Sequence, residues 1–255
     1  MSYSVYNLSN YTSPVIKEVS GKDYIKFGED NDYFDYLIDN YTGSPTNNAI
    51  INGITVQLYG AGLDAKDKAR KPQQWAALIG MLSPKDLRAV ILDYQICGQA
   101  SFQVVYEGDR VKYLKHFPVT TLRPQKANED GEIENYYYCA DWSKLKPSQK
   151  PSALPAFGFG SKEESEILYI KPYSTGSFYF APTDYQGALP YCEVEQELAN
   201  FHINNIKNGF MGSMLINFNN GKPDDDDQRK IEQKIKQKFT GSSNAGRFVL
   251  AFNDS

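Results

Sequence analysis

The stretch LPYCEVEQELANFHINNIKN, residues 189–208, decides how this chain is organised. Its apolar side chains recur at helical spacing, and Asn208-Gly209 follows as a break, so the pattern predicts one long helix. A helix of about 20 residues rises about 30 Å at 1.5 Å per residue. We therefore expect a rod, and we interpret the segments on either side from it.

The segment that follows the rod predicts a small α/β head. An apolar strand is expected over 211–218, a polar helix over 223–239, and a closing strand over 247–252 that pairs with the first. Four consecutive acids, Asp224–Asp227, stand at the start of the polar helix. They complement the helix dipole and lack the alternation, glycine and distal glutamate of an EF-hand loop. We expect helix capping there and no metal site.

The residues before the rod predict helices first and strands later. In chain order, helices are expected over 31–41, 44–60, 72–81 and 83–97, strands over 101–106, 111–116, 132–142 and 166–173, and an extended segment over 117–122. Gly53 lies inside the second helix, where glycine costs roughly 1 kcal/mol relative to alanine, so close packing is expected at that point. Residues 143–165 contain three prolines and are expected to form a surface loop or linker.

Composition excludes several classes of protein. The chain has 255 residues, 41% of them hydrophobic, enough for one large or two small domains. Its net charge of −4 disfavours the wrapping of nucleic acid around it. Met1–Asn10 lacks the features of a signal peptide, and no apolar run approaches the ~20 residues of a membrane span, so no membrane partner is expected. Cys97, Cys139 and Cys192 are widely spaced, which favours free thiols in a reducing cytosol over a zinc site.

The sequence contains no recognisable catalytic constellation. The motifs GxSxG, GxxxxGKS/T and HExxH are all absent. His116 and His202 are the only histidines, and an isolated histidine is more often structural than a general base, because catalysis needs a positioned partner. Phe157–Gly160 is glycine-rich, but no strand is expected before it and no helix after it, so we do not expect a phosphate cradle. We predict a protein without enzymatic activity, catalytic residues or cofactor.

Two sets of side chains are candidates for interactions. An apolar stripe on the rod is expected to face neighbouring molecules and comprises Val194, Leu198, Phe201 and Ile206. A basic run on the polar helix comprises Arg229, Lys230, Lys234, Lys236 and Lys238. The basic run fits a solvated helix face, and a contact with phosphate or with a protein partner is the alternative.

The order of several short motifs resembles the portal proteins of tailed bacteriophages and prophages. The motifs are Gly28-Glu29-Asp30-Asn31, Asn40-Tyr41, Ser44–Ile50, Tyr59–Leu63, His116–Pro124, Glu166–Ile170, Gly187-Ala188-Leu189, Lys207-Asn208-Gly209, Gly212–Leu215, Phe239-Thr240-Gly241 and Ser243–Arg247. They extend over about 220 residues, which is nearly the whole chain. The agreement is best in the segment from Gly187 onward.

The resemblance implies an α+β fold made of a wing domain (1–188), a stem helix (189–209) and most of a clip domain (210–255). It implies a dodecameric ring at the capsid vertex of a virion, assembled in the cytoplasm of the bacterial host, through which double-stranded DNA is packaged and ejected. The implied partners are the terminase large subunit, head-completion or adaptor proteins and the capsid protein. Portal chains are usually longer, and the second stem helix, tunnel loop and crown are expected to follow the last residue.

Two other readings stay open. The abundance of Tyr, Asn and Asp fits a secreted or surface carbohydrate-binding module, although the amount of helix and the lack of a signal peptide count against it. An enzyme with a carboxylate pair is the second alternative, and nothing in the sequence specifies such a pair.

Overall fold

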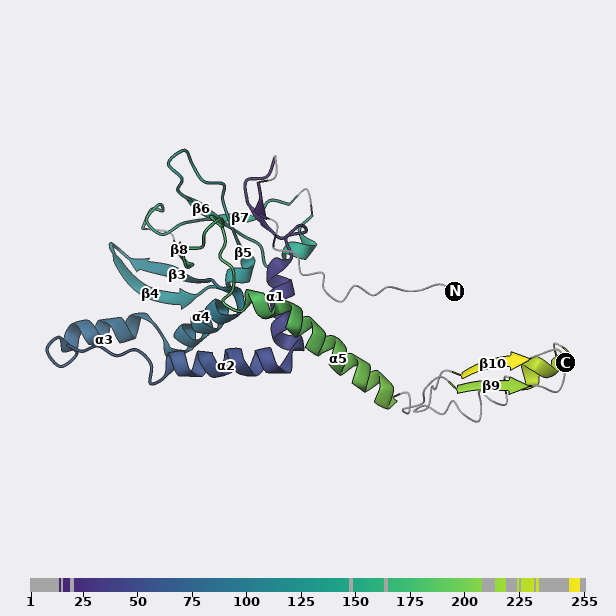
Figure 1. The fold of residues 1–255 in the computed structure, drawn as a ribbon. Helices are drawn as coiled ribbons and strands as arrows, with labels where there is room; N and C mark the ends of the chain where they lie inside the picture. Colours follow the sequence, from purple (N-terminus) through teal and green to yellow (C-terminus); the bar gives the residue numbers. More distant parts are fainter. Residues whose placement is uncertain are drawn as a thin grey trace. The chain divides into compact units, whose positions relative to one another are not determined.

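The computed structural model describes residues 14, 16–18, 21–146, 149–162, 165–207, 214–218, 224, 226–231, 233 and 248–252. The chain forms two compact units, Met1–Glu193 (unit 1) and Val194–Ser255 (unit 2). The fold is α+β, as the sequence predicts (Figure 1). In chain order, the helices and strands are β1 (Ile16–Lys17), β2 (Lys26–Phe27), α1 (Tyr33–Gly43), α2 (Pro45–Tyr59), α3 (Pro72–Met81), α4 (Pro84–Cys97), β3 (Ala100–Glu107), β4 (Arg110–His116), η1 (Val119–Thr121), β5 (Leu122–Pro124), β6 (Asn135–Tyr138), η2 (Trp142–Lys144), β7 (Ser152–Pro155), β8 (Glu166–Ile170), η3 (Gln186–Ala188), α5 (Leu189–Lys207), β9 (Met214–Phe218) and β10 (Phe248–Phe252).

Local sequence signals set the ends of the first helices. At the start of α2, the Ser44 hydroxyl accepts a hydrogen bond from the amide of Asn47, and Ser83 caps α4 in the same way through the amide of Asp86. Gly98 ends α4 with a φ of 70°, a left-handed conformation that glycine adopts without strain. The helices predicted in this region, α1 to α4, are all confirmed.

The first sheet has the strand order β4-β3-β8 and is antiparallel (Figure 1). Gly108, with a φ of 62°, lies in the tight turn between β3 and β4, the two strands expected over 101–106 and 111–116. Val90 of α4 packs in one apolar cluster with Ala100 and Phe102 of β3. The strands expected here are confirmed, although β8 ends at Ile170 rather than at residue 173.

The second sheet has the strand order β5-β6-β7. Two segments that lead into and out of its strands differ from what the sequence predicts. The extended segment expected over 117–122 is wrong for η1. Pro118 holds its φ at −60°, and the Thr121 hydroxyl donates to the Pro118 carbonyl at 2.7 Å, so the chain turns there. The strand expected over 132–142 is confirmed only for β6, because the indole of Trp142 turns back to donate to the Thr121 carbonyl at 3.0 Å.

β7 lies inside the segment expected to be a loop or linker, and that prediction is wrong for residues 152–155. β7 pairs with β6 in antiparallel register, with Asn135 opposite Pro155. As an edge strand of its three-stranded sheet, β7 tolerates proline, because one of its sides makes no regular ladder. A parallel bridge between Ala156 and Ile167 then joins this sheet to β8.

The main core of unit 1 joins side chains from distant parts of the chain. Phe27 of β2 stacks on Phe180 with 4.1 Å between the ring centroids, and Phe34 of α1 meets both rings edge-on. Leu189, the first residue of α5, is fully buried in the same cluster. The beginning of α5 is therefore anchored in the core of unit 1.

One packing expectation for α2 is wrong. Among the described residues, nothing lies within 4 Å of a Cβ atom built at Gly53, so no close contact there explains this glycine. Ile51 is buried, whereas Ile50 and Leu58 are 55% and 59% exposed. α2 thus packs through a narrow face around Ile51, and Gly53 lies outside that face.

Unit 2 contains the rest of α5 and a two-stranded ribbon. β9 pairs with β10 in parallel register, with Met214 opposite Phe248, which confirms the predicted partners. Residues 226–231 and 233, between the two strands, are helical, as the crossover between parallel strands usually is. The remaining residues of the predicted head, Lys234, Lys236 and Lys238 among them, lie outside the described residues. The division into wing, stem and clip stays a prediction.

Candidate functional site

The apolar stripe predicted on α5 is largely exposed to solvent. Val194, Leu198, Phe201 and Ile206 are 42%, 56%, 61% and 63% exposed. At 100° per residue, the first three lie within an arc of about 60°, and Ile206 lies about 80° from Leu198. Ile203, which the sequence analysis did not single out, is also 47% exposed. The helix thus presents several large apolar side chains that the isolated chain leaves in water.

The first turn of α5 behaves differently from the rest of the helix. Leu189 and Cys192 are buried in unit 1. The Tyr36 hydroxyl of α1 donates a hydrogen bond to Oε1 of Glu193 at 2.6 Å. These contacts hold the base of the helix, so the exposed stripe begins where the anchoring contacts end.

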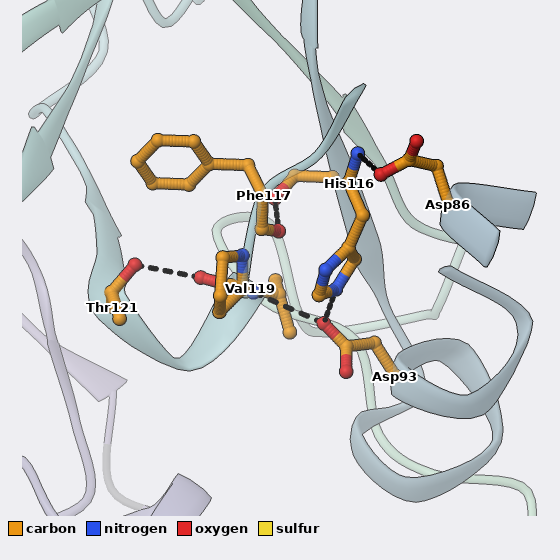
Figure 2. Close-up of polar contacts among 8 residues, drawn as sticks. Asp86, Asp93, His116, Phe117, Val119 and Thr121 are labelled. Carbon is orange, nitrogen blue, oxygen red and sulfur yellow. Dashed lines mark hydrogen bonds and ion pairs between the residues drawn. The ribbon is translucent and has the colours of Figure 1, made fainter. Parts of the chain in front are cut away.

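His116 lies in a polar cluster between α4 and the end of β4, and Figure 2 shows its ring directed toward Asp93. His116 Nε2 is 2.8 Å from Oδ2 of Asp93, which also accepts a hydrogen bond from the amide of Val119 at 3.3 Å. The amide of His116 donates to Oδ1 of Asp86 at 3.0 Å. The pKa of Asp86 is lowered, first by the hydrogen bond from the Ser83 hydroxyl and then by this amide, while burial opposes the shift. Two aspartates of α4 therefore hold β4 and η1 against the helix.

A histidine–carboxylate pair is also two-thirds of a catalytic triad, and the nearby hydroxyls decide what it can do. Such a pair activates a nucleophile only within hydrogen-bond reach of the ring. The Ser101 hydroxyl donates to the Phe117 carbonyl at 2.7 Å, and the Thr121 hydroxyl donates to the Pro118 carbonyl. Within the described ranges, no hydrogen bond joins a hydroxyl or thiol to the His116 ring. The contacts of Asp86 and Asp93 hold the segment that follows β4 in place.

Arg123 is the centre of a second cluster, and the sequence analysis did not single it out. Its side chain is buried, and its guanidinium donates to the carbonyls of Thr120 at 2.8 Å and Asn31 at 2.9 Å. It lies between the rings of Phe34 and Trp142, 5.0 Å and 4.9 Å from their centroids. Burial lowers the pKa of Arg123 to about 10. This arginine ties the turn before α1 to β5.

The glycine-rich loop 157–160 binds a carboxylate of the chain itself. The amides of Gly158 and Gly160 donate to the two oxygens of Glu166 at 3.0 Å and 3.1 Å, and the Tyr106 hydroxyl donates at 2.6 Å. Burial, and then the bond to Glu166, raise the pKa of Tyr106 to about 12. A strand, β7, does precede this loop, contrary to the sequence-based expectation. The amides of Gly158 and Gly160 are therefore occupied by Glu166.

The basic run is described only in part. Arg229 and Lys230 are exposed, and Lys230 pairs with Asp227 at 2.9 Å. Oδ1 of Asp224 accepts a hydrogen bond from the amide of Asp227 at 2.9 Å, which confirms that Asp224 caps the helical stretch. In the part of the chain that the structure describes, no group of three or more His, Cys, Asp or Glu side chains is arranged to hold a metal ion. No helix there has the length and apolar character needed to cross a membrane.

Comparison with known proteins reveals the fold but no sequence family. No protein-family model matches this chain, and no curated protein matches it. Among solved structures, a chain of the "virion of native gene transfer agent (GTA) particle" is similar, with a TM-score of 0.56 and 14% sequence identity over 85% of this chain. A chain of the "neck of empty GTA particle computed with C6 symmetry" is similar with a TM-score of 0.53 and 14% identity, again over 85%.

The likeness extends over most of this chain but not over most of its neighbours. The matched region covers 57% and 58% of the two particle chains, so this chain spans little more than half their length. At 14% identity the comparison establishes a shared fold. The fold is thus one found in chains of a gene transfer agent particle.

Proposed function

We propose that this chain is a portal, or connector, subunit of a tailed phage or prophage. The observation that carries the proposal is the fold shared with chains of a gene transfer agent particle over 85% of the sequence. The order of motifs that resembles portal proteins supports it independently. The likeness also favours this reading over a carbohydrate-binding module, because both neighbours are chains of a particle.

The exposed stripe on α5 supports assembly into a ring. Leu198 and Phe201 are 56% and 61% exposed, and burying one large apolar side chain contributes roughly 1.5–3 kcal/mol. In a ring, each stem helix would lie beside two others and cover these side chains. The subunit's part in the process is then architectural, and we expect no catalysis by His116 or by any other residue of this chain.

The partners follow from this role. Twelve copies would form the ring at the capsid vertex, in contact with the capsid protein. The terminase large subunit would dock during packaging in the host cytoplasm, and head-completion or adaptor proteins would dock afterwards. Double-stranded DNA would pass through the channel, and the basic residues Arg229 and Lys230 are candidates for phosphate or partner contacts.

The mass in solution tests the proposal. Light scattering would compare this 255-residue chain with a version extended toward the length of the particle chains it resembles. We expect the extended version to reach the mass of a ring and to show rings by negative-stain microscopy. An extended version that remains monomeric at every concentration would contradict the portal assignment.

A further inference from the structure

One edge of β8 is hydrogen-bonded to β3, and the other edge is its outer edge. Along a strand, the amide and carbonyl of successive residues point alternately to the two sides, so the residues whose backbone groups point outward can be identified. Ser101 of β3 turns its carbonyl toward the β4 side, where it accepts a hydrogen bond from the amide of Phe117 at 3.1 Å. Its neighbour Phe102 therefore turns its backbone groups toward β8, opposite Leu168. Along β8, the amide and carbonyl of Leu168 then point toward β3, and those of Tyr169 point toward the outer edge.

The outer edge of β8 is covered at one end only. The Ile167 carbonyl accepts a hydrogen bond from the amide of Phe157 at 3.0 Å, beside the bridge between Ala156 and Ile167. Further along, none of the hydrogen bonds shown for the described chain uses the outward amide and carbonyl of Tyr169. Among the described residues, the edge is therefore unpaired at Tyr169, and an open edge of this kind can accept another strand.

An aromatic groove runs beside this open edge. It has a volume of about 350 Å³, and its lining includes Tyr136, Phe157, Phe159, Tyr169, Lys171 and Phe178. Phe157, Phe159 and Phe178 are about half exposed, at 48%, 47% and 53%. Tyr136 and Tyr169 stack on each other with 4.7 Å between centroids. The groove therefore offers apolar surface for the side chains of an added strand.

The lining of the groove also includes a cation, Lys171, and an acid, Glu132, and no ion pair joins the two among the described residues. Lys171 is partly buried, donates a hydrogen bond to the Phe178 carbonyl, and lies 5.2 Å from the centroid of the Phe178 ring. Burial lowers the pKa of Lys171. Among the described residues, no carboxylate forms an ion pair with it, although other lysines such as Lys126 and Lys162 have such partners. A ligand with a carboxylate would supply the ion-pair partner that Lys171 lacks among the described residues.

We propose that the outer edge of β8 binds an extended segment of a partner polypeptide by strand addition, with apolar or aromatic side chains in the groove and an aspartate or glutamate paired with Lys171. Hydrogen bonds to the backbone of Tyr169 would set the register, and the groove and Lys171 would select the sequence. This binding site does not depend on ring formation, so the proposal can fail while the portal assignment stands.

The test uses a defined probe and the full 255-residue chain. The probe is a fluorescein-labelled peptide of nine residues that alternates threonine with valine and phenylalanine and has an aspartate near each end, so that either strand direction can reach Lys171. We expect saturable binding by fluorescence anisotropy. A probe with lysines in place of the aspartates, and one methylated on its central backbone amides, should each bind at least about fivefold more weakly.

Two protein variants locate the site. Lys171→Glu and Phe178→Ala should each weaken binding of the aspartate probe at least about fivefold. The control is Lys150→Glu, at an exposed lysine outside the groove lining, which should leave binding of the probe unchanged. Circular dichroism melting confirms that each variant is folded. Amide-resolved hydrogen exchange should show new protection at Tyr169 on binding and no change at Leu168, which β3 already bonds.

The outcomes are decisive in both directions. Saturable binding that depends on Lys171 and protects the Tyr169 amide would support the proposal. No saturable binding, equal binding of the methylated probe, or binding without protection of Tyr169 would overturn it.

Discussion

At the scale of single residues, Gly53 and Gly98 show that the same residue type can have different structural roles. Gly98 has a φ of 70°, and a Cβ atom there would lie 2.3 Å from the Pro182 carbonyl oxygen. Gly53 lies in the middle of α2, and no described residue comes within 4 Å of a Cβ atom built there. The first is required by close approach of the backbone, and the second only weakens a helix.

We therefore expect opposite effects of alanine at these two positions. Gly98→Ala should lower the free energy of unfolding by about 3 kcal/mol, because it adds both backbone strain and a clash. Gly53→Ala should raise it by about 1 kcal/mol, because alanine favours the helix. Urea denaturation of the two variants measures both effects. A Gly53→Ala chain no more stable than the parent would contradict the prediction.

Asp86 carries a prediction about pH. Folding lowers the pKa of Asp86 below the value of about 3.9 that an aspartate has in an unfolded chain. The carboxylate therefore stabilises the fold at every pH above that value, and this stabilisation is lost as pH falls through the folded-state pKa. Asp86→Asn should therefore melt at a lower temperature than the parent at pH 7, and the gap should narrow as pH falls below about 4. Thermal melting from pH 7 to pH 3 tests this, with Asp30→Asn, an exposed position, as control. A gap that stays constant with pH would contradict the prediction.

At the scale of secondary-structure elements, α5 combines an anchored base with an exposed body. Leu189 and Cys192 are buried, whereas Leu198 is 56% exposed. Exposed apolar side chains at helical spacing are typical of surfaces that another molecule covers. The interface role of Val194, Leu198, Phe201 and Ile206 stays a prediction.

A matched pair of variants tests the facing of this helix. Leu198→Asp places a charge on the apolar stripe, and Glu197→Ala changes the adjacent, exposed position. In a chain able to assemble, Leu198→Asp should abolish or strongly weaken assembly, because an unpaired charge in a buried interface costs several kcal/mol. Glu197→Ala should assemble normally. Sedimentation velocity measures the outcome, and equal assembly of the two variants would refute the proposed facing.

At the scale of the whole molecule, charge limits what the chain can bind by itself. The net charge is −4, and the described part of the basic run offers Arg229 and Lys230, the latter already paired with Asp227. A chain of this charge has little electrostatic attraction for phosphate, which agrees with the proposal that DNA passes the subunit without being held.

We expect any DNA binding by the chain to be weak and sensitive to salt. With so few phosphate contacts, the dissociation constant at physiological salt should be on the order of 10⁻⁴ M, and it should rise steeply as salt is added. Fluorescence anisotropy with a labelled duplex measures this, and Arg229→Ala should weaken binding where Lys66→Ala does not. Tight, salt-resistant or sequence-specific binding would count against the portal proposal.

The sequence by itself determined the α+β class, helices α1 to α5, strands β3 and β4, and the pairing of β9 with β10. These features depend on side chains a few positions apart, such as Ser83 with Asp86, or on the period of the apolar pattern, so they can be recognised without a structure. The apolar stripe of α5 could be recognised for the same reason.

Only the tertiary structure decided β7, the clusters around His116 and Arg123, and the open edge of β8. Asn31 and Arg123 are 92 positions apart, and Asp93 and His116 are 23 apart, so no local pattern connects them. β7 carries too little periodicity to be recognised, because its ladder with β6 supplies hydrogen bonds that do not depend on side-chain type. Backbone pairing and the burial of polar groups depend on which segments meet in the folded chain. A sequence pattern can therefore predict them only where the two partners lie a few residues apart.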